Sequence, residues 1–490
     1  WVPSACPPTR CSILRRSWTA RRQTASGNPL GGAVRRQRGR LSPGPMALRH
    51  LVSIDDLSNE EILVLFEHAR RMEEDLRGWA DTAPGFIMAS LFYEPSTRTR
   101  LSFESAMRRL GGGVVSSADM RQSSVAKGET LADTIRVVGG AVADVIVLRH
   151  PNEGAAQVAA DYSSVPVING GDGSHEHPTQ TLCDLYTLWR EKGHIEGLDV
   201  VMNGDLRYSR TIHSFCFALA RLGASIVACP HPGYELPDYV IDRLKIQYGN
   251  EPVRCEIEDL KAVTSGGVDA AYFTPQRPHQ LSLFTGDPGE VVAKLDALYM
   301  TRPQTERFAD GEGSDTHFPS LSPDGLQGAR VKDIRVMHPL PRTDEISYAM
   351  DEDPRSVYFK QAARGVPVRM AVTAYLLGQL DLGVGASSDV RDEELFENAG
   401  GCRCPNTTCI TNTEASYLVP RFRVRRRTPL MAECRYCEGR LEGGAVGCRS
   451  TRRYHRTNAS AVRKIAASNL VLFESPEQAQ ARGYTGAGGD

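Results

Sequence analysis

The chain lacks any uninterrupted apolar run of about 18 residues, the length that a membrane-spanning helix requires. We therefore expect neither a membrane-spanning segment nor a membrane partner. It also lacks a Walker loop and a Gly-x-Gly-x-x-Gly fingerprint at the start of a βα unit, which argues against a nucleotide enzyme. A nucleophile elbow is missing as well. The 490 residues suffice for roughly two to four domains with large buried cores.

Residues 1–45 contain no acidic residue and no periodic apolar pattern, but they include nine arginines. Such a segment does not form a packed core. Because the chain starts with Trp1 and Met46 directly precedes the first regular segment, we interpret residues 1–45 as a disordered or non-native extension upstream of a start at Met46. A transit peptide is the alternative interpretation.

Charge is unevenly distributed along the chain. Residues 46–400 hold 34 Lys and Arg against 52 Asp and Glu, a net charge of −18, whereas residues 401–465 hold 14 against 4, a net charge of +10. The basic C-terminal region could dock on the acidic body or bind another acidic partner. A nucleic-acid-binding protein is thus one hypothesis for function, to be weighed against an enzyme.

Four of the 12 cysteines are scattered singly through the acidic body, at Cys183, Cys216, Cys229 and Cys255. This spacing is unlike a secreted disulfide framework. We therefore expect a cytoplasmic protein.

From Met46 to about residue 382, short β-rich runs alternate with amphipathic helical stretches, which predicts an α/β fold with two parallel-sheet domains and an active site between them. Predicted strands include residues 144–148, 165–169, 199–203, 225–228 and 335–337. Polar residues follow these strands, at the edge where open α/β sheets bind ligands. The expected domains are 46–190 with a late helix 365–382 packing back, 191–364 with an insertion near 262–290, a linker 383–400, a small zinc-bound β-rich domain 401–446 and a tail 447–490.

The segment Ser96-Thr97-Arg98-Thr99-Arg100 predicts a phosphate-binding loop. An apolar run, residues 86–93, precedes it, and apolar residues at helical spacing follow it, so the loop should join a strand to a helix N-terminus. There the unpaired backbone N–H groups favour an anion, and arginine binds phosphate oxygens in pairs. A capped surface helix with scattered arginines is the alternative.

Further polar segments could belong to the same site. The loop 123–130 offers Lys127, although Lys-Gly loops are usually solvated surface. In the segment 175–180, His175 and His177 lack the spacing of a zinc metalloprotease, so we prefer His177 as a hydrogen-bond donor to a substrate carbonyl. Residues 269–277 resemble residues 296–304 at an offset of 27, through coincidence or a small duplication, and either could end a strand with Arg and Gln.

Together these segments resemble the carbamoyltransferase family. The resemblance rests on residues 96–100, 127–130, 149–151 and 177–180, and segments 204–210, 299–304 and 338–342 are similar to the aspartate-specific members of that family. Ornithine-specific members would carry His-Pro-Cys-Gln and His-Cys-Leu-Pro motifs, which this chain lacks. The match runs in order from about residue 48 to residue 382.

The resemblance implies aspartate carbamoyltransferase activity: a carbamoyl group passes from carbamoyl phosphate to L-aspartate in the second step of pyrimidine biosynthesis. Direct amine attack would need no cofactor. The resemblance also implies that four residues are catalytic, namely Arg98, Thr99, Arg149 and His177. The implied carbamoyl phosphate-binding residues are Ser96, Thr97, Arg98, Thr99, Arg149, His177, Gln180, Pro339 and Leu340.

The resemblance also implies that Arg210, Arg302, Gln304 and Lys127 bind L-aspartate. We prefer the pair at 302 and 304 over Gln276 and Arg277 because it preserves the family's order. Ser123 and Lys127 would enter the site of a neighbouring subunit, which predicts a homotrimer or a multiple of trimers.

Cys404-x4-Cys409, 24 intervening residues and Cys434-x2-Cys437 have the spacing of a structural zinc site, with disulfides as the alternative. The flanking residues resemble the zinc domain of the regulatory chain that accompanies this family. The linker leaves no room for that chain's nucleotide-binding domain, so we expect a fused zinc domain without nucleotide allostery through it.

Residues 454–484 resemble a small zinc module known from DNA-alkylation repair, but Ala459, Ala487 and Asp490 stand where thiols are expected. Cys448 is not placed to replace them. We therefore expect a metal-free remnant rather than a nucleic-acid contact.

Overall fold

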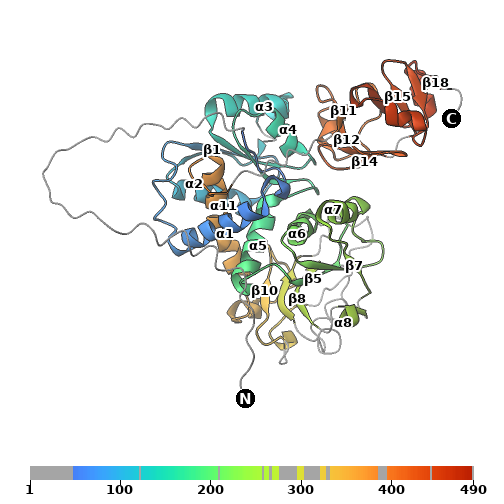
Figure 1. Ribbon diagram of the computed structural model, residues 1–490. Coiled ribbons are helices and arrows are strands. Elements are labelled where there is room, and N and C mark those ends of the chain that lie inside the picture. Colours follow the sequence, from blue (N-terminus) through green and yellow to red (C-terminus); the bar gives the residue numbers. More distant parts are fainter. Residues whose placement is uncertain are drawn as a thin grey trace, which may run out of the picture. The chain divides into compact units, whose positions relative to one another are not determined.

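The computed structural model describes ten segments of the chain (Figure 1). These are residues 48–120, 123–207, 210–256, 259–263, 267–274, 295–302, 320–326, 331–384, 394–441 and 444–487. The predicted extension 1–45, Gln276, Arg277 and Gln304 lie outside them, as does most of the predicted insertion. None of the helices in these segments combines the length and apolar character needed to cross a membrane.

The first domain is built on a parallel sheet with strand order β2-β1-β3-β4. Its strands are β1 (Ile87–Phe92), β2 (Gly113–Ser117), β3 (Val145–His150) and β4 (Val167–Asp172). Its helices are α1 (Asn59–Glu74), α2 (Thr97–Arg109), α3 (Leu131–Val137), α4 (Ala155–Tyr162) and α5 (Pro178–Lys192). Side chains alternate between the two faces of β3: Val147 joins a core with α1 and α2, and Ile146 joins one with α3 and α4.

The second domain has a six-stranded parallel sheet with order β10-β9-β8-β5-β6-β7. Its strands are β5 (Asp199–Gly204), β6 (Ser225–Pro230), β7 (Val253–Arg254), β8 (Val268–Thr274), β9 (Leu295–Met300) and β10 (Arg335–Met337). Its helices are α6 (Arg210–Arg221), α7 (Asp238–Tyr248) and α8 (Leu260–Val263). The predicted parallel α/β architecture is confirmed, and each of the five predicted strands overlaps an observed one.

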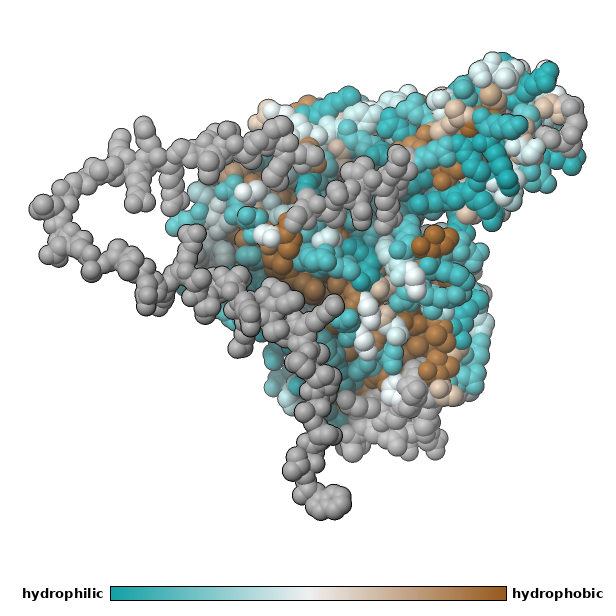
Figure 2. Space-filling model, in the orientation of Figure 1, coloured by the Kyte–Doolittle hydropathy of each residue, from teal (hydrophilic) through white to brown (hydrophobic). Residues whose placement is uncertain are grey.

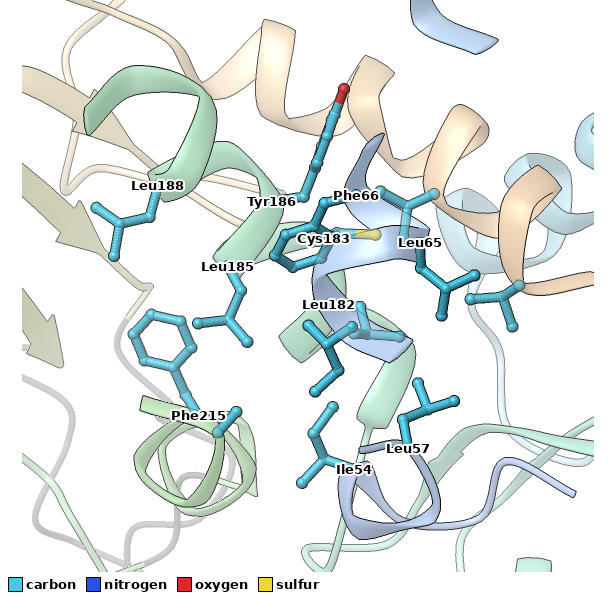
Figure 3. Close-up of a cluster of buried hydrophobic side chains, with 14 of the residues drawn as sticks. Ile54, Leu57, Leu65, Phe66, Leu182, Cys183, Leu185, Tyr186, Leu188 and Phe215 are labelled. Carbon is cyan, nitrogen blue, oxygen red and sulfur yellow. The ribbon is translucent and has the colours of Figure 1, made fainter. Parts of the chain in front are cut away.

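Helix α5 joins the cores of the two domains. Its apolar side chains meet those of α1 in the first domain, while Phe215 of α6 packs near Leu185 and Leu188 (Figure 3). Ten of its fifteen residues are buried. Since its first turn carries His177 and Gln180, this packing fixes those two residues between the two sheets.

The late helix is longer at its start than predicted. Helix α11 spans Tyr358–Leu376 rather than residues 365–382. Gly365 and Pro367 weaken helix propensity, yet both are buried inside α11, where tertiary packing against α1, α2 and α5 outweighs propensity. A Cβ at Gly365 would lie 2.4 Å from Arg369 Nη1, so close packing explains the glycine.

The two similar segments at an offset of 27 form neighbouring strands. Strands β8 and β9 pair in parallel with Tyr272 opposite Tyr299, and the two rings stack with centroids 4.3 Å apart. The repeated sequence therefore places equivalent residues side by side in one sheet.

Two small sheets follow the second domain. The four-cysteine domain contains β11 (Leu395–Glu397), β12 (Arg421–Arg427), β13 (Leu430–Cys434), β14 (Arg440–Leu441) and the short helix α12 (Ile410–Thr413). The tail contains β15 (Ala445–Cys448), β16 (Arg453–His455), β17 (Leu470–Phe473), β18 (Thr485–Gly486) and α13 (Pro476–Ala481). Hydrophilic residues cover most of their visible surface (Figure 2).

Glutamates neutralise much of the basic strand β12. Arg421 pairs with Glu397 at 2.9 Å, and Arg425 pairs with Glu433 at 2.5 Å. Internal ion pairs thus take up part of the positive charge of residues 401–465.

Candidate active site

The candidate site lies at the carboxyl ends of both parallel sheets. In the first sheet, the strand order reverses between β1 and β3, and in the second it reverses between β5 and β8. Such switch points are where open α/β sheets bind ligands. The backbone N–H of Tyr93, just beyond β1, donates to the carbonyl of Arg149 at the end of β3 over 2.8 Å. The predicted phosphate loop therefore starts beside Arg149.

The predicted phosphate loop joins β1 to the N-terminus of α2, as expected. Ser96 is the N-cap residue, and its side chain makes no capping hydrogen bond. Thr97, Arg98 and Thr99 form the first helical residues, whose backbone N–H groups have no partner within the helix. The buried Thr99 and the helix dipole add to an environment suited to an anion.

The side chains of Arg149 and His177 both lie close to Gly171. A Cβ at Gly171 would lie 2.8 Å from Arg149 Nη1 and 3.3 Å from His177 Cδ2. Gly171 also has φ +113°, which disfavours any other residue. Both side chains belong to motifs that the sequence shows, whereas no motif indicates the glycine that allows them to approach.

Arg149 is buried with little to balance its charge. Its Nη1 donates to the carbonyl of Gly170 at 3.0 Å, and its Nη2 lies 3.3 Å from Glu94 Oε2. Burial lowers the pKa of Arg149, and Glu94 offsets this only in part. Burial lowers the pKa of Arg98 too. The buried guanidinium of Arg149 therefore favours an anionic ligand.

The buried carboxyl of Asp184, which no sequence motif indicated, orients Gln180. Asp184, one helical turn further along α5, accepts hydrogen bonds from Gln180 Nε2 at 2.8 Å, Gln361 Nε2 at 2.9 Å and the Tyr299 hydroxyl at 2.9 Å. Burial raises the pKa of Asp184 to about 7, although the three donors favour its ionised form. Because the amide nitrogen of Gln180 is engaged, its oxygen is left to accept from a ligand N–H. The one feature of the sequence that could have indicated this contact is an acidic residue four positions after Gln180 on a buried helix.

The loop after β10 carries Pro339 and Leu340 to the phosphate loop. Arg98 Nη2 donates to the carbonyl of Leu340 at 2.6 Å. His338 supports the loop: its Nδ1 accepts from the Leu340 N–H at 2.8 Å, and its Nε2 lies 2.8 Å from Glu345 Oε1. The two halves of the predicted site are therefore in direct contact.

The predicted aspartate-binding residues lie at the edge of the second sheet. Arg302 follows the end of β9, and Arg210 is the first residue of α6, although its side chain falls outside the described part. At the nearby switch point, a Cβ on Gly204 would lie 1.9 Å from the carbonyl oxygen of Thr274, so the glycine allows β5 and β8 to approach closely at their carboxyl ends. Gln304 lies beyond the described residues.

Ser123 and Lys127 lie apart from this contact. Lys127 ends a short 3-10 helix, Ser124–Lys127, and is exposed. Within the described segments, its side chain makes no hydrogen bond or ion pair. The Ser123 hydroxyl donates to the carbonyl of Met120 at 2.5 Å.

Cys404, Cys409, Cys434 and Cys437 form a buried cluster with sulfur atoms within 4.8 Å of one another. The Cys404 and Cys437 sulfurs are 3.4 Å apart, and those of Cys409 and Cys434 are 3.9 Å apart. Sulfurs that bind one tetrahedral zinc ion at about 2.3 Å lie about 3.8 Å apart, so the cluster fits such an ion. None of the described cysteines forms a disulfide.

Three family models match the chain. Residues 49–190 match the carbamoyl-P binding domain of aspartate/ornithine carbamoyltransferase, and residues 273–376 match its Asp/Orn binding domain. Residues 398–446 match the metal binding domain of the aspartate carbamoyltransferase regulatory chain.

Curated relatives and solved structures agree with these models. The aspartate carbamoyltransferase catalytic subunit of Methanothrix thermoacetophila is 44% identical over 332 residues, covering 67% of this chain and 98% of that protein. The catalytic subunit of Thermoplasma acidophilum is 45% identical, with the same coverage.

Among solved structures, the catalytic subunit of Methanocaldococcus jannaschii aspartate transcarbamoylase is 42% identical, covering 67% of this chain and 98% of that chain with a TM-score of 0.54. The Trypanosoma cruzi enzyme in complex with N-(phosphonacetyl)-L-aspartic acid is 32% identical, covering 67% of this chain and 94% of that chain with a TM-score of 0.53. With its two matched domains and its additional metal-binding domain, the chain belongs to the aspartate carbamoyltransferase family.

Proposed function

We propose that this chain transfers the carbamoyl group of carbamoyl phosphate to the amine of L-aspartate, in the second step of pyrimidine biosynthesis. The observation that carries this proposal is the hydrogen bond from Arg98 to the Leu340 carbonyl. It joins an anion-binding helix N-terminus of the carbamoyl phosphate-binding domain to a loop of the aspartate-binding domain, where two substrates can meet.

The phosphate group would be held at the start of α2. Ser96, Thr97 and Thr99 supply hydroxyl and backbone N–H donors, and Arg98 supplies a guanidinium. A bound phosphate would pair with the exposed Arg98 and balance the charge of the buried Arg149.

Carbonyl activation would fall to Thr99, Arg149 and His177. The aspartate amine attacks the carbonyl carbon and forms a tetrahedral intermediate, whose oxyanion these donors stabilise. The carbon–oxygen bond to phosphate then breaks, and the departing phosphate takes up the amine proton. The oxygen of Gln180 and the carbonyls of Pro339 and Leu340 would accept hydrogen bonds from the carbamoyl nitrogen. Orientation and charge stabilisation would provide the rate without a cofactor.

L-Aspartate brings two carboxylates and therefore needs cations. Arg210 and Arg302 would supply cations from one chain, with Gln304 as an uncharged hydrogen-bond donor, and Lys127 would add a cation from a neighbouring subunit, next to the hydroxyl of Ser123. The exposed Lys127 side chain, which makes no polar contact within the described part of its own chain, supports such sharing. We infer a homotrimer or a multiple of trimers.

The four-cysteine cluster would hold a structural zinc ion. Bound zinc would crosslink two loops of a domain too small to be stable alone. The single cysteines scattered through residues 183–255 are unlike a secreted disulfide framework, so we infer a cytoplasmic location. We further propose the domain limits 46–190 and 191–364, followed by a four-cysteine domain that starts before the predicted residue 401, at β11, and by a metal-free tail that starts before the predicted residue 447, at β15.

Substituting Arg302→Ala tests the aspartate assignment. It should raise the KM for aspartate at least about tenfold, because a charged hydrogen bond to a carboxylate is lost, and leave the KM for carbamoyl phosphate nearly unchanged. Steady-state kinetics with each substrate varied in turn give both values. An unchanged KM for aspartate would reject Arg302 as a ligand.

A further inference from the structure

The four-cysteine domain docks on the carbamoyl phosphate-binding domain next to its own metal ligands. Residues on both sides of Cys409 pair with Glu153: the Ile410 N–H donates to the Glu153 carbonyl at 2.9 Å, and the Glu153 N–H donates to the Thr408 carbonyl at 3.2 Å. Gly154 lies so close to Tyr436 that a Cβ there would approach its side chain to 2.5 Å. The loops that carry the four cysteines therefore form this contact.

The same domain also touches the aspartate-binding domain through Glu438. This residue directly follows Cys437 and has φ 59°, so the turn that ends the cysteine pair directs its side chain. Glu438 Oε2 accepts a hydrogen bond from Arg243 Nη1 of α7 at 2.7 Å. Nearby, Arg440 forms an ion pair with Asp242 of the same helix.

Arg243 connects three parts of the chain. Besides Glu438, it contacts Asp55 Oδ2 at 2.7 Å and lies 3.7 Å from Glu176 Oε1, both in the carbamoyl phosphate-binding domain. Its side chain is 8% exposed and stacks over the ring of Phe217 at 4.0 Å. A guanidinium buried this deeply depends on its carboxylate partners, so the loss of one should disturb the others.

The loop that Glu438 contacts leads into the active site. Glu438 Oε2 lies 3.8 Å from His175 Nε2, and Glu176 is held by hydrogen bonds from the Ser53 hydroxyl at 2.8 Å and the Ile54 N–H at 3.2 Å. The next residue is His177, the N-cap of α5. Displacement of His175 and Glu176 would therefore reach His177 within one or two residues.

A cation site is the other interpretation of His175, Glu176 and Glu438, whose ligand atoms lie within 4.8 Å of one another. The position of Arg243 argues against a cation site. Its Nη1 is already 2.7 Å from Glu438 and 3.7 Å from Glu176, so a guanidinium occupies the position where a metal ion would neutralise these carboxylates.

We propose that Glu438 is a positioning residue for carbamoyl transfer, through which the four-cysteine domain holds the aspartate-binding domain against the loop that carries His177. The inference rests on the proposed function of the site. Because coupling between two binding sites is reciprocal, substrate binding must then also affect how firmly the domain retains its metal.

The variant Glu438→Gln tests the kinetic side. The aspartate KM should rise about tenfold, because α7 loses the ion pair between Arg243 and Glu438. The carbamoyl phosphate KM should change less, and the bound zinc per chain should stay the same. The control Glu397→Gln removes an exposed carboxylate of the same domain and should leave all three values unchanged. In Glu438→Gln/Arg243→Gln, the effects of the two substitutions on the aspartate KM should be less than additive, because both break the same ion pair. A wild-type aspartate KM for Glu438→Gln, or a loss of zinc that accounts for its defect, overturns the proposal.

Zinc release gives a readout that is independent of activity. Release from the full chain to the chelator 4-(2-pyridylazo)resorcinol is followed with and without N-(phosphonacetyl)-L-aspartate, which joins a phosphonate to aspartate. This compound should slow release from the wild type at least threefold and have no effect on Glu438→Gln. Equal rates with and without it in the wild type, faster release, or the same slowing in both proteins contradicts the inference. A wild type that forms no carbamoyl-aspartate instead rejects the proposed function.

Discussion

At the scale of single residues, a glycine decides whether Arg149 and His177 can share one site. Gly171 leaves the space in which both side chains approach, at a backbone conformation that other residues rarely adopt. Neither property shows in a motif, because the space depends on the end of β3 and the start of α5 coming together. The sequence thus identified the charged residues and missed the small one between them.

The variant Gly171→Ala should lower kcat about 10²-fold, because its methyl group displaces Arg149 and His177 from their positions. Gly193→Ala is a matched control: Gly193 also has a positive φ, +83°, but has nothing within 4 Å of the added Cβ. Both variants should lose about 1 kcal/mol of stability, measured by thermal unfolding, and only Gly171→Ala should lose activity. Equal activity in the two variants would contradict this account of Gly171.

At the scale of elements, helix α5 organises the site. Its first turn holds His177 and Gln180, its next turn holds Asp184, and its buried face joins the cores of both domains. Sequence patterns predicted the parallel strands around it, because the burial patterns of strands are local. The early start of α11 at Tyr358 could not be predicted, since packing against three other helices overrides Gly365 and Pro367.

Asp184→Asn tests the role of the buried carboxyl. With its pKa raised to about 7, Asp184 is neutral in the folded protein at pH 5 and must ionise at pH 8, whereas the unfolded state is ionised at both. Its contribution to stability is therefore lost as the pH rises through about 7. Asn cannot ionise, so the stability of the variant relative to the wild type should be higher at pH 8 than at pH 5, by up to about 3 kcal/mol.

The same variant should raise the KM for carbamoyl phosphate, because Asn cannot accept all three hydrogen bonds that Asp184 receives from Gln180, Gln361 and Tyr299. Thermal unfolding at both pH values and steady-state kinetics provide the two measurements. Stability differences that do not vary with pH would show that Asp184 does not titrate in this range.

At the scale of the whole molecule, one chain carries both substrate domains and a domain that matches the metal binding domain of the aspartate carbamoyltransferase regulatory chain. Motif order and cysteine spacing were enough to predict this organisation. The contacts between domains were not predictable: Arg98 with Leu340 and Arg243 with Glu438 join residues 242 and 195 positions apart. Such pairs follow from the assembled fold rather than from any local pattern.

Mixing two inactive variants tests whether subunits share sites. Arg98→Ala and Lys127→Ala should each be nearly inactive alone, but mixed trimers contain some sites with both residues intact and should recover activity. Arg98→Ala mixed with His177→Ala is the control, because those two residues serve a site from the same chain and no intact site can form. Recovery in neither mixture would reject Lys127 as a residue of the neighbouring site.

The most direct test of the central claim is the formation of carbamoyl-aspartate from carbamoyl phosphate by the purified full chain, with L-ornithine as the competing amine and Arg98→Ala as the control. We expect product from aspartate and none from ornithine. Product formation should fall by about 10²-fold or more in Arg98→Ala, because the phosphate loses its guanidinium and Leu340 loses its hydrogen bond. No product from aspartate, preferential use of ornithine, or full activity of Arg98→Ala would contradict the account.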